Sequence, residues 1–217
     1  PRLMSCWLGE PAVAEARVPE SVELRLRRAA ALVDAGRDPE PVLSAVLAAD
    51  PFEWRATWLR GVQCLAAGDG AGAAERFSDV WTELPGELAP KLAIALAAEA
   101  VGDLERAGEL FAIVAGIDDS YVSAMFGLAR VATRRGDPAA AVRAYELVPT
   151  TSAVYIDAQL AAARARIAAV TQAGALAELT HAAFTVDRLL LDARTRAEAQ
   201  AEILEAALTG VQGGTTA

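Results

Sequence analysis

The chain has 217 residues, of which 54% are hydrophobic but only 6% are aromatic, so alanine and leucine supply most of its apolar side chains. Both are strong helix formers, and this composition predicts an all-α fold. The formal net charge of −9, from 29 acidic and 20 basic residues, argues against a nucleic-acid-binding protein, because phosphate contacts require a concentrated basic face.

The first predicted element is a helical hairpin over residues 20–51. Ser21 is a good N-cap for a helix that ends near Ala35, and Gly36 supplies the turn. The second helix carries an apolar stripe formed by Val42, Leu43, Val46 and Leu47. Residues 1–19 contain prolines and little periodicity, so we expect a linker or extended segment there.

A pattern with a period of 34 residues follows. The dipeptide Gly-Asp occurs at 68–69, 102–103 and 136–137. An alanine follows each glycine by five residues and an aromatic residue follows each alanine by four, which gives the pairs Ala73 and Phe77, Ala107 and Phe111, and Ala141 and Tyr145. A small residue precedes each glycine by seven, at Gly61, Ala95 and Ala129. This is the Ala-x₃-Phe core of the tetratricopeptide repeat (TPR).

Each repeat unit is predicted to be a helix pair that cannot bury its apolar side alone. Small residues let the backbones approach closely, and the aromatic residue fills the space between neighbouring units. Gly-Asp forms the turn, because glycine adopts left-handed φ and aspartate caps the next helix. We therefore predict a TPR-type solenoid of helical hairpins with units at about 20–51, 54–87, 88–121 and 122–153.

Three further helices are predicted after the last repeat, over Ser152–Val170, Leu176 to about Leu191, and Ala193–Leu208. They are weaker copies of the repeat or caps on the last hairpin, since terminal repeats are usually atypical. The glycine- and threonine-rich tail over 210–217 is expected to fray. The predicted repeat domain thus spans 20–217, with capping helices at 153–209.

No arrangement of residues in the sequence suggests catalysis or metal binding. Cys6 and Cys64 are the only cysteines and His181 is the only histidine, so we expect no metal, no cofactor and no general base. This cysteine usage favours a reduced, cytoplasmic protein. The longest apolar run, residues 92–101, is too short for a membrane span. The chain begins at Pro1, which suggests a piece of a longer polypeptide.

A repeat of this kind offers a surface for protein partners instead. The first helices of stacked hairpins line a concave groove that suits an extended peptide or a partner helix. The predicted groove residues are Arg55, Trp58, Leu92, Glu99, Phe126, Arg130 and Arg134. The arginines could bind carboxylates through paired N–H groups, or could simply be solvated. The three apolar residues could equally belong to the core.

Two blocks of sequence are more specific than the period. The blocks "FSDVWTELPGELAPKLAIALAAEAVGD" (77–103) and "SAMFGLARVATRRGDPAAAVRAYELVPTTS" (123–152) resemble the C-terminal tetratricopeptide domain of actinobacterial serine/threonine protein kinase G. With "ESVELRLRRAAALVDAGR" (20–37), the resemblance covers most of residues 20–170. It implies a parent polypeptide with a rubredoxin-like metal module and a kinase domain, in which this domain supports the kinase, assembles protomers or recruits partners.

The kinase motifs themselves are absent from the sequence, namely a glycine-rich loop followed by a strand lysine, His-Arg-Asp and Asp-Phe-Gly. The resemblance therefore assigns no catalytic residue to this chain. It implies a non-catalytic scaffold whose partners are the kinase domain in cis and another copy of the chain. Two alternatives stay open: a free-standing TPR adaptor with unrelated peptide partners, and an α-helical enzyme with a site between repeats.

Overall fold

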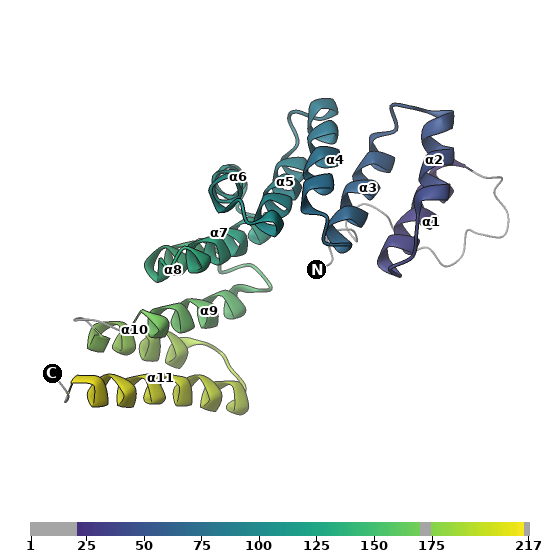
Figure 1. Cartoon of the computed structure of the whole chain (residues 1–217). Helices are drawn as coiled ribbons and strands as arrows, with labels where there is room; N and C mark the ends of the chain where they lie inside the picture. Colours follow the sequence, from purple (N-terminus) through teal and green to yellow (C-terminus); the bar gives the residue numbers. More distant parts are fainter. Residues whose placement is uncertain (1–20, 170–174, 215–217) are drawn as a thin grey trace. The chain divides into compact units, whose positions relative to one another are not determined.

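The computed structural model describes residues 21–169 and 175–214, with side chains for 21–169 and 176–209. Every regular element in these residues is an α-helix (Figure 1), which confirms the predicted all-α class. The chain divides into two compact units, unit 1 up to Asp103 and unit 2 from Leu104. Unit 1 contains α1 (Val22–Asp34), α2 (Glu40–Ala49), α3 (Trp54–Ala66), α4 (Gly70–Glu83) and α5 (Leu88–Val101). Unit 2 contains α6 (Leu104–Ile117), α7 (Val122–Arg134), α8 (Pro138–Glu146), α9 (Tyr155–Ala168), α10 (Ala175–Arg188) and α11 (Ala193–Gly214).

In unit 1 consecutive helices pack on one another (Figure 1). The α1 helix begins after its predicted cap, where the Ser21 hydroxyl accepts a hydrogen bond from the Leu24 N–H at 3.2 Å. Gly36, in the turn before α2, has a left-handed φ of 65°. The apolar stripe of α2 is also confirmed, since Leu43 and Val46 are fully buried.

The Gly-Asp pairs form the predicted turns. Gly68, Gly102 and Gly136 have φ values of 81°, 86° and 73°, which glycine reaches without the steric cost that other residues incur. The Asp69 carboxylate accepts a hydrogen bond from the Gly72 N–H at 2.8 Å, and Asp137 accepts one from Ala140 at 2.8 Å. Glycine thus ends one helix and aspartate begins the next, as the sequence predicted.

The repeated alanines and phenylalanines form the core of the two units. Ala73, Ala107 and Ala141 are completely buried, and Phe77 and Phe111 are 1% and 0% exposed. The two rings contact glycines on different helices. A Cβ placed on Gly61 of α3 would lie 2.6 Å from Cε1 of Phe77, and a Cβ on Gly127 of α7 would lie 2.6 Å from Cε1 of Phe111. Phe111 therefore packs between predicted repeats, whereas Phe77 packs on Gly61 inside the α3–α4 hairpin.

The last three helices of unit 2 form a bundle. Their shared core consists of Leu160 and Ala163 of α9, Leu179, Ala182, Val186 and Leu189 around α10, and Ala199 and Ile203 of α11. Arg166 of α9 joins this bundle to the preceding hairpin. Its guanidinium, only 13% exposed, pairs with Glu146 of α8 and with Glu178 of α10.

The ends of these helices differ from the predicted ends. The α9 helix begins at Tyr155 rather than at Ser152, because the preceding residues form turns in which Ser152 donates to the Pro149 carbonyl and Tyr155 to that of Ser152. The α10 helix ends at Arg188, before the predicted Leu191, and α11 continues to Gly214, into the tail expected to fray. Residues 1–19, Val170 and 215–217 lie outside the described residues.

Candidate partner-binding site

Unit 1 contains a cavity of about 560 Å³, bounded by α1, α3, α4, the start of α5 and the turns that precede α3 and α5. We call it the unit 1 cavity. Leu26, Leu59 and Val80 form its floor, and they are 1%, 3% and 1% exposed. Trp54 and Trp58 of α3 are half-buried and contribute its aromatic lining. The volume lies within the range of about 300–1,000 Å³ typical of ligand sites.

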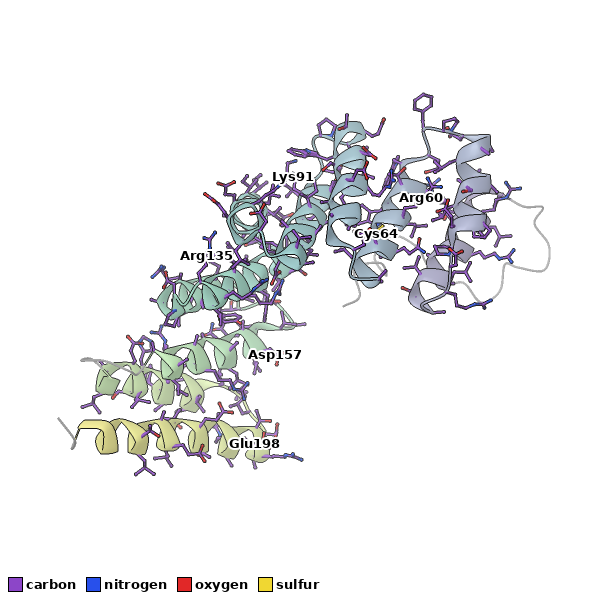
Figure 2. The ribbon with its side chains drawn as sticks, viewed as in Figure 1. Arg60, Cys64, Lys91, Arg135, Asp157 and Glu198 are labelled. Carbon is purple, nitrogen blue, oxygen red and sulfur yellow. The ribbon has the colours of Figure 1, made fainter. Side chains whose placement is uncertain are left out.

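Both turns at the rim of the unit 1 cavity are held by specific hydrogen bonds. In the turn before α3, the Phe52 N–H donates to the Asp50 carboxylate at 3.0 Å, and this turn presents a Phe52 side chain that is 78% exposed. In the turn before α5, Lys91 donates to the carbonyls of Pro85 and Glu87 at 3.0 and 3.1 Å. Figure 2 labels this lysine, whose Nζ also lies 5.2 Å from the centre of the Trp81 ring.

Arg55 forms the ion pairs at the edge of the unit 1 cavity. Its guanidinium donates two hydrogen bonds to Glu53, from Nε and Nη2 at 2.7 Å each, and one to Glu23 of α1 at 2.8 Å. Arg55 therefore holds the pKa of Glu53 below its usual value, although burial opposes the shift. The same hydrogen bonds raise the pKa of Arg55. This arginine binds carboxylates of its own chain.

The structure gathers only part of the predicted groove. Arg55 and Trp58 both line the unit 1 cavity, and the Trp58 ring lies 5.0 Å from that of Phe77. Leu92 is 5% exposed and belongs to the core, which is the alternative that the sequence left open. Glu99 is half-buried on α5 and does not line the unit 1 cavity.

The other three predicted groove residues lie in unit 2, on α7. Phe126 is half-buried and meets the Tyr145 ring edge-on at 5.4 Å. Arg130 is exposed, with its guanidinium carbon 6.0 Å from the centre of the Phe111 ring. Arg134 is exposed in the last turn of α7, where a cation interacts favourably with the helix dipole. A partner-binding role for the predicted set stays a prediction.

The rim of the unit 1 cavity was not predicted from the sequence. Phe52, Glu53, Leu84 and Glu87 lie in or beside the turns between hairpins, and none of them was among the predicted groove residues. One signal was available in the sequence. A large aromatic residue directly after Asp50-Pro51 stands in a turn, where burial in a helix–helix core is not expected.

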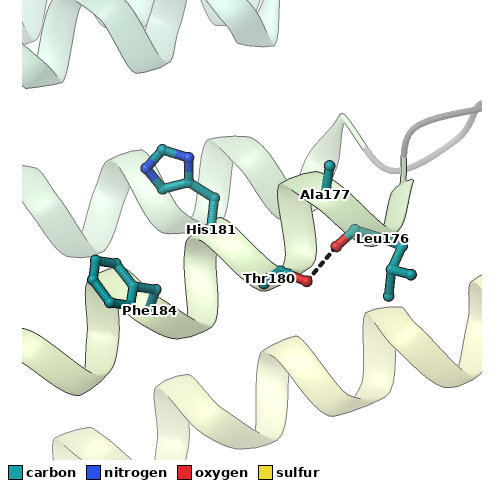
Figure 3. Close-up of a pocket in the computed structure, with 5 residues that line it drawn as sticks. All are labelled: Leu176, Ala177, Thr180, His181 and Phe184. Atoms are coloured by element: carbon teal, nitrogen blue, oxygen red, sulfur yellow. Dashed lines mark hydrogen bonds between the residues drawn. The ribbon is translucent and has the colours of Figure 1, made fainter.

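A second hollow, of about 860 Å³, lies along α10 in unit 2 (Figure 3). All five residues that line it come from this one helix: Leu176, Ala177, Thr180, His181 and Phe184. Leu176 and Phe184 are 78% and 57% exposed, and the Thr180 hydroxyl donates to the Leu176 carbonyl at 2.7 Å. A hollow bounded by one helix is an exposed apolar face, whereas the unit 1 cavity is enclosed by several elements.

Two candidate reactive side chains lie in the described part of the chain, and the Arg76 guanidinium only partly opposes the rise that burial causes in the pKa of the first, Cys64. Cys64 is a free, half-buried thiol, and burial raises its pKa, with a further contribution from the Asp69 carboxylate. His181 is exposed on α10. Residues 21–169 and 175–214 contain no group of three or more potential metal ligands. Within the same residues, no helix is long and apolar enough to cross a bilayer.

Comparison with known proteins identifies the family. The family model for the protein kinase G tetratricopeptide repeat matches residues 8–217. The chain belongs to the protein kinase G tetratricopeptide repeat family. The resemblance found in the sequence is thereby confirmed, and the chain is a TPR domain rather than a kinase domain.

Relatives of this kinase G repeat chain include two curated kinases. It is 39% identical over 150 residues to serine/threonine-protein kinase PknG of Mycobacterium leprae and 36% identical over 146 residues to that of Mycolicibacterium smegmatis. Each match covers 66% of the chain and 19% of the relative, so the chain spans about a fifth of their length. The solved structure of a thermophilic TPR protein of Thermus thermophilus is similar to the chain, with a TM-score of 0.56 and 16% sequence identity. The match covers 87% of this chain and 100% of the Thermus chain, and at this identity it shows the TPR fold alone.

Proposed function

We propose that the chain is the non-catalytic protein-interaction domain of a serine/threonine protein kinase, acting in kinase regulation, self-assembly or partner recruitment. The observation that carries this proposal is the family match over residues 8–217. The two curated relatives are named as kinases, and the matched segment is 19% of each, which leaves ample length for a catalytic domain elsewhere in those proteins.

The fold supports a role in binding proteins. Stacked helical hairpins present extended surfaces, and such surfaces are a common means of holding peptides and helices. The partners that we propose are the kinase domain in cis and another copy of the chain, in the cytoplasm. The free Cys64 thiol agrees with that reducing compartment.

The test uses three purified proteins: the product of the whole gene, the same product ended before residue 1, and the chain itself. Phosphotransfer from labelled ATP to a generic basic substrate protein is measured for each, and calorimetry measures association of the chain with the shortened product. We expect phosphotransfer by the first two proteins only, together with measurable binding of the chain to the shortened product.

Each part of the proposal has its own contrary result. Phosphotransfer by the purified chain would show that it is an enzyme. If the whole gene encodes no kinase domain, the proposed link to a kinase is wrong and the chain is a free-standing TPR adaptor. If the shortened product neither binds the chain nor differs from the whole product in oligomeric state or activity, the proposed roles in regulation and assembly are lost.

A further inference from the structure

We infer that the unit 1 cavity is a docking site for a basic, apolar-anchored peptide of a partner protein. The peptide inserts one large apolar side chain between two arginine or lysine residues. This inference rests on the proposed function as a protein-interaction domain, and it names the site and the chemistry of the partner. It differs from the groove predicted along the first helices, because the rim lies on the turns between hairpins.

The floor of the unit 1 cavity requires an apolar occupant. Leu26, Leu59 and Val80 are almost completely buried, and none of them offers a hydrogen-bonding side chain. The Trp58 side chain is held in place, because its ring packs 5.0 Å from the buried Phe77 ring. An apolar side chain that enters here exchanges contact with water for contact with these residues, which is favourable.

The rim of the unit 1 cavity requires positive charge. Asp50 and Glu87 contribute two exposed carboxylates to the lining, whereas the Glu53 carboxylate is already paired with the Arg55 guanidinium. Arg55 is already bound to Glu53 and Glu23, so it adds little attraction for an acidic partner. Cations can also stack on exposed aromatic rings, and Phe52 offers one at the same rim. The combination selects an apolar group flanked by cations.

The rim is also preorganised for binding. Asp50 fixes the turn that carries Phe52, and Lys91 fixes the turn that carries Glu87. A partner therefore meets turns that are already ordered, and less conformational entropy is lost on association. Phe52 is an exposed phenylalanine on a fixed turn beside an apolar cavity, and phenylalanine is among the aromatic residues enriched in protein interfaces.

The experiment measures fluorescence anisotropy of labelled dodecapeptides titrated with the full 217-residue chain. The probe carries a central Leu-Phe between two pairs of arginines, in a Gly-Ser background. One comparison peptide replaces the arginines by glutamates, and a second replaces Leu-Phe by Ser-Ser. We expect the probe to bind about tenfold more tightly than either comparison peptide, and its affinity to fall with added salt.

Four variants locate the binding site. Phe52→Ser and Glu87→Lys change the rim of the unit 1 cavity, and we expect each to weaken the probe by about fivefold or more. Phe184→Ser and Glu105→Lys make the same changes at exposed positions of unit 2, and should leave affinity within about twofold. Glu105→Lys also measures general attraction of the peptide to an acidic chain. All four positions are exposed, so folding, checked by circular dichroism, should be retained.

Several results would overturn the inference. The first is equal weakening by the rim variants and their unit 2 controls, and the second is equal binding of the Glu-substituted or Ser-Ser peptide. Competition by free arginine amide at the probe's own concentration would assign the site to a small cation instead. None of these results affects the comparison of whole and shortened gene products, so failure of this site is distinguishable from failure of the proposed function.

Discussion

Phe77 in unit 1 and Phe111 in unit 2 occupy the same position of the repeat but have different surroundings. Both rings are buried, and both lie so close to a glycine that a Cβ there would be 2.6 Å away. The glycine of Phe77 is Gly61, inside one hairpin, whereas that of Phe111 is Gly127, at the start of the next repeat. The glycine that each ring contacts therefore lies in the same hairpin for Phe77 and in the following repeat for Phe111.

The difference extends to what covers each ring. Phe77 supports Trp58, which lines the unit 1 cavity, whereas Phe111 lies beneath the Arg130 guanidinium at 6.0 Å. A single repeat position thus supports a candidate binding site in one unit and a cation–aromatic contact in the other.

The largest expected effect tests what Phe77 and Phe111 share, which is the burial of their rings. Phe77→Ala and Phe111→Ala should each lower the free energy of unfolding by about 3–5 kcal/mol, because each removes a fully buried ring. Urea denaturation followed by circular dichroism measures the change. Only Phe77→Ala should also weaken the basic probe peptide, since only Phe77 supports Trp58. Equal loss of peptide affinity in both variants would contradict the distinction between the two surroundings.

A smaller effect tests the glycines. Gly61→Ala and Gly127→Ala place a Cβ 2.6 Å from a buried ring, so each should cost about 1–3 kcal/mol despite the better helix propensity of alanine. Gly108→Ala is the matched control. Its Cβ would meet Val131 at 3.4 Å, an ordinary contact, and it should stabilise the chain by about 0.5–1 kcal/mol. Thermal unfolding midpoints measure the effect of all three substitutions. A higher midpoint for Gly61→Ala or Gly127→Ala would show that the phenylalanine ring moves aside.

Much of the fold could be predicted because its determinants are local and periodic. The Gly-Asp spacing located three turns, since glycine and aspartate act within a few residues of themselves. Ala73, Ala107 and Ala141 were buried as predicted because the period places them on one face. The contact of Phe111 with Gly127 was not predicted, because the repeat pattern marks a small residue at Gly61 but not at the position of Gly127.

The candidate site could be predicted only in part for a related reason. Trp58 and Arg55 were found because they lie on a helix with a clear period. The rim residues Phe52 and Glu87 lie in turns, where no sequence period indicates which way a side chain points. The role of Arg55 was also open, since pairing with Glu23 joins residues 32 positions apart. Only the fold shows that this arginine is bound within its own chain.

The smallest expected effect concerns the charges beside the unit 1 cavity. The pKa of Glu53 is lowered from its usual 4.5 in the folded chain, so its pairing with Arg55 stabilises the fold above that pH. This stabilisation is lost as the pH falls through the folded pKa. Glu53→Gln should therefore cost about 1 kcal/mol at pH 7, and its midpoint should converge with that of the unsubstituted chain as the pH is lowered from 5 towards 3, about the usual range of carboxyl titration.

Unit 2 offers a matched pair for this test. Arg164 donates to Glu202 at 2.9 and 3.1 Å with the same two-bond geometry, but the Glu202 side chain is 41% exposed and that of Glu53 only 10%. Water screens the more exposed pair, so Glu202→Gln should cost less than about 0.5 kcal/mol. If the two substitutions cost the same at pH 7, the Glu53–Arg55 pair is no stronger than a surface pair. Arg55 would then be free to exchange the carboxylates of its own chain for those of a partner. In that case the unit 1 cavity would not prefer basic peptides.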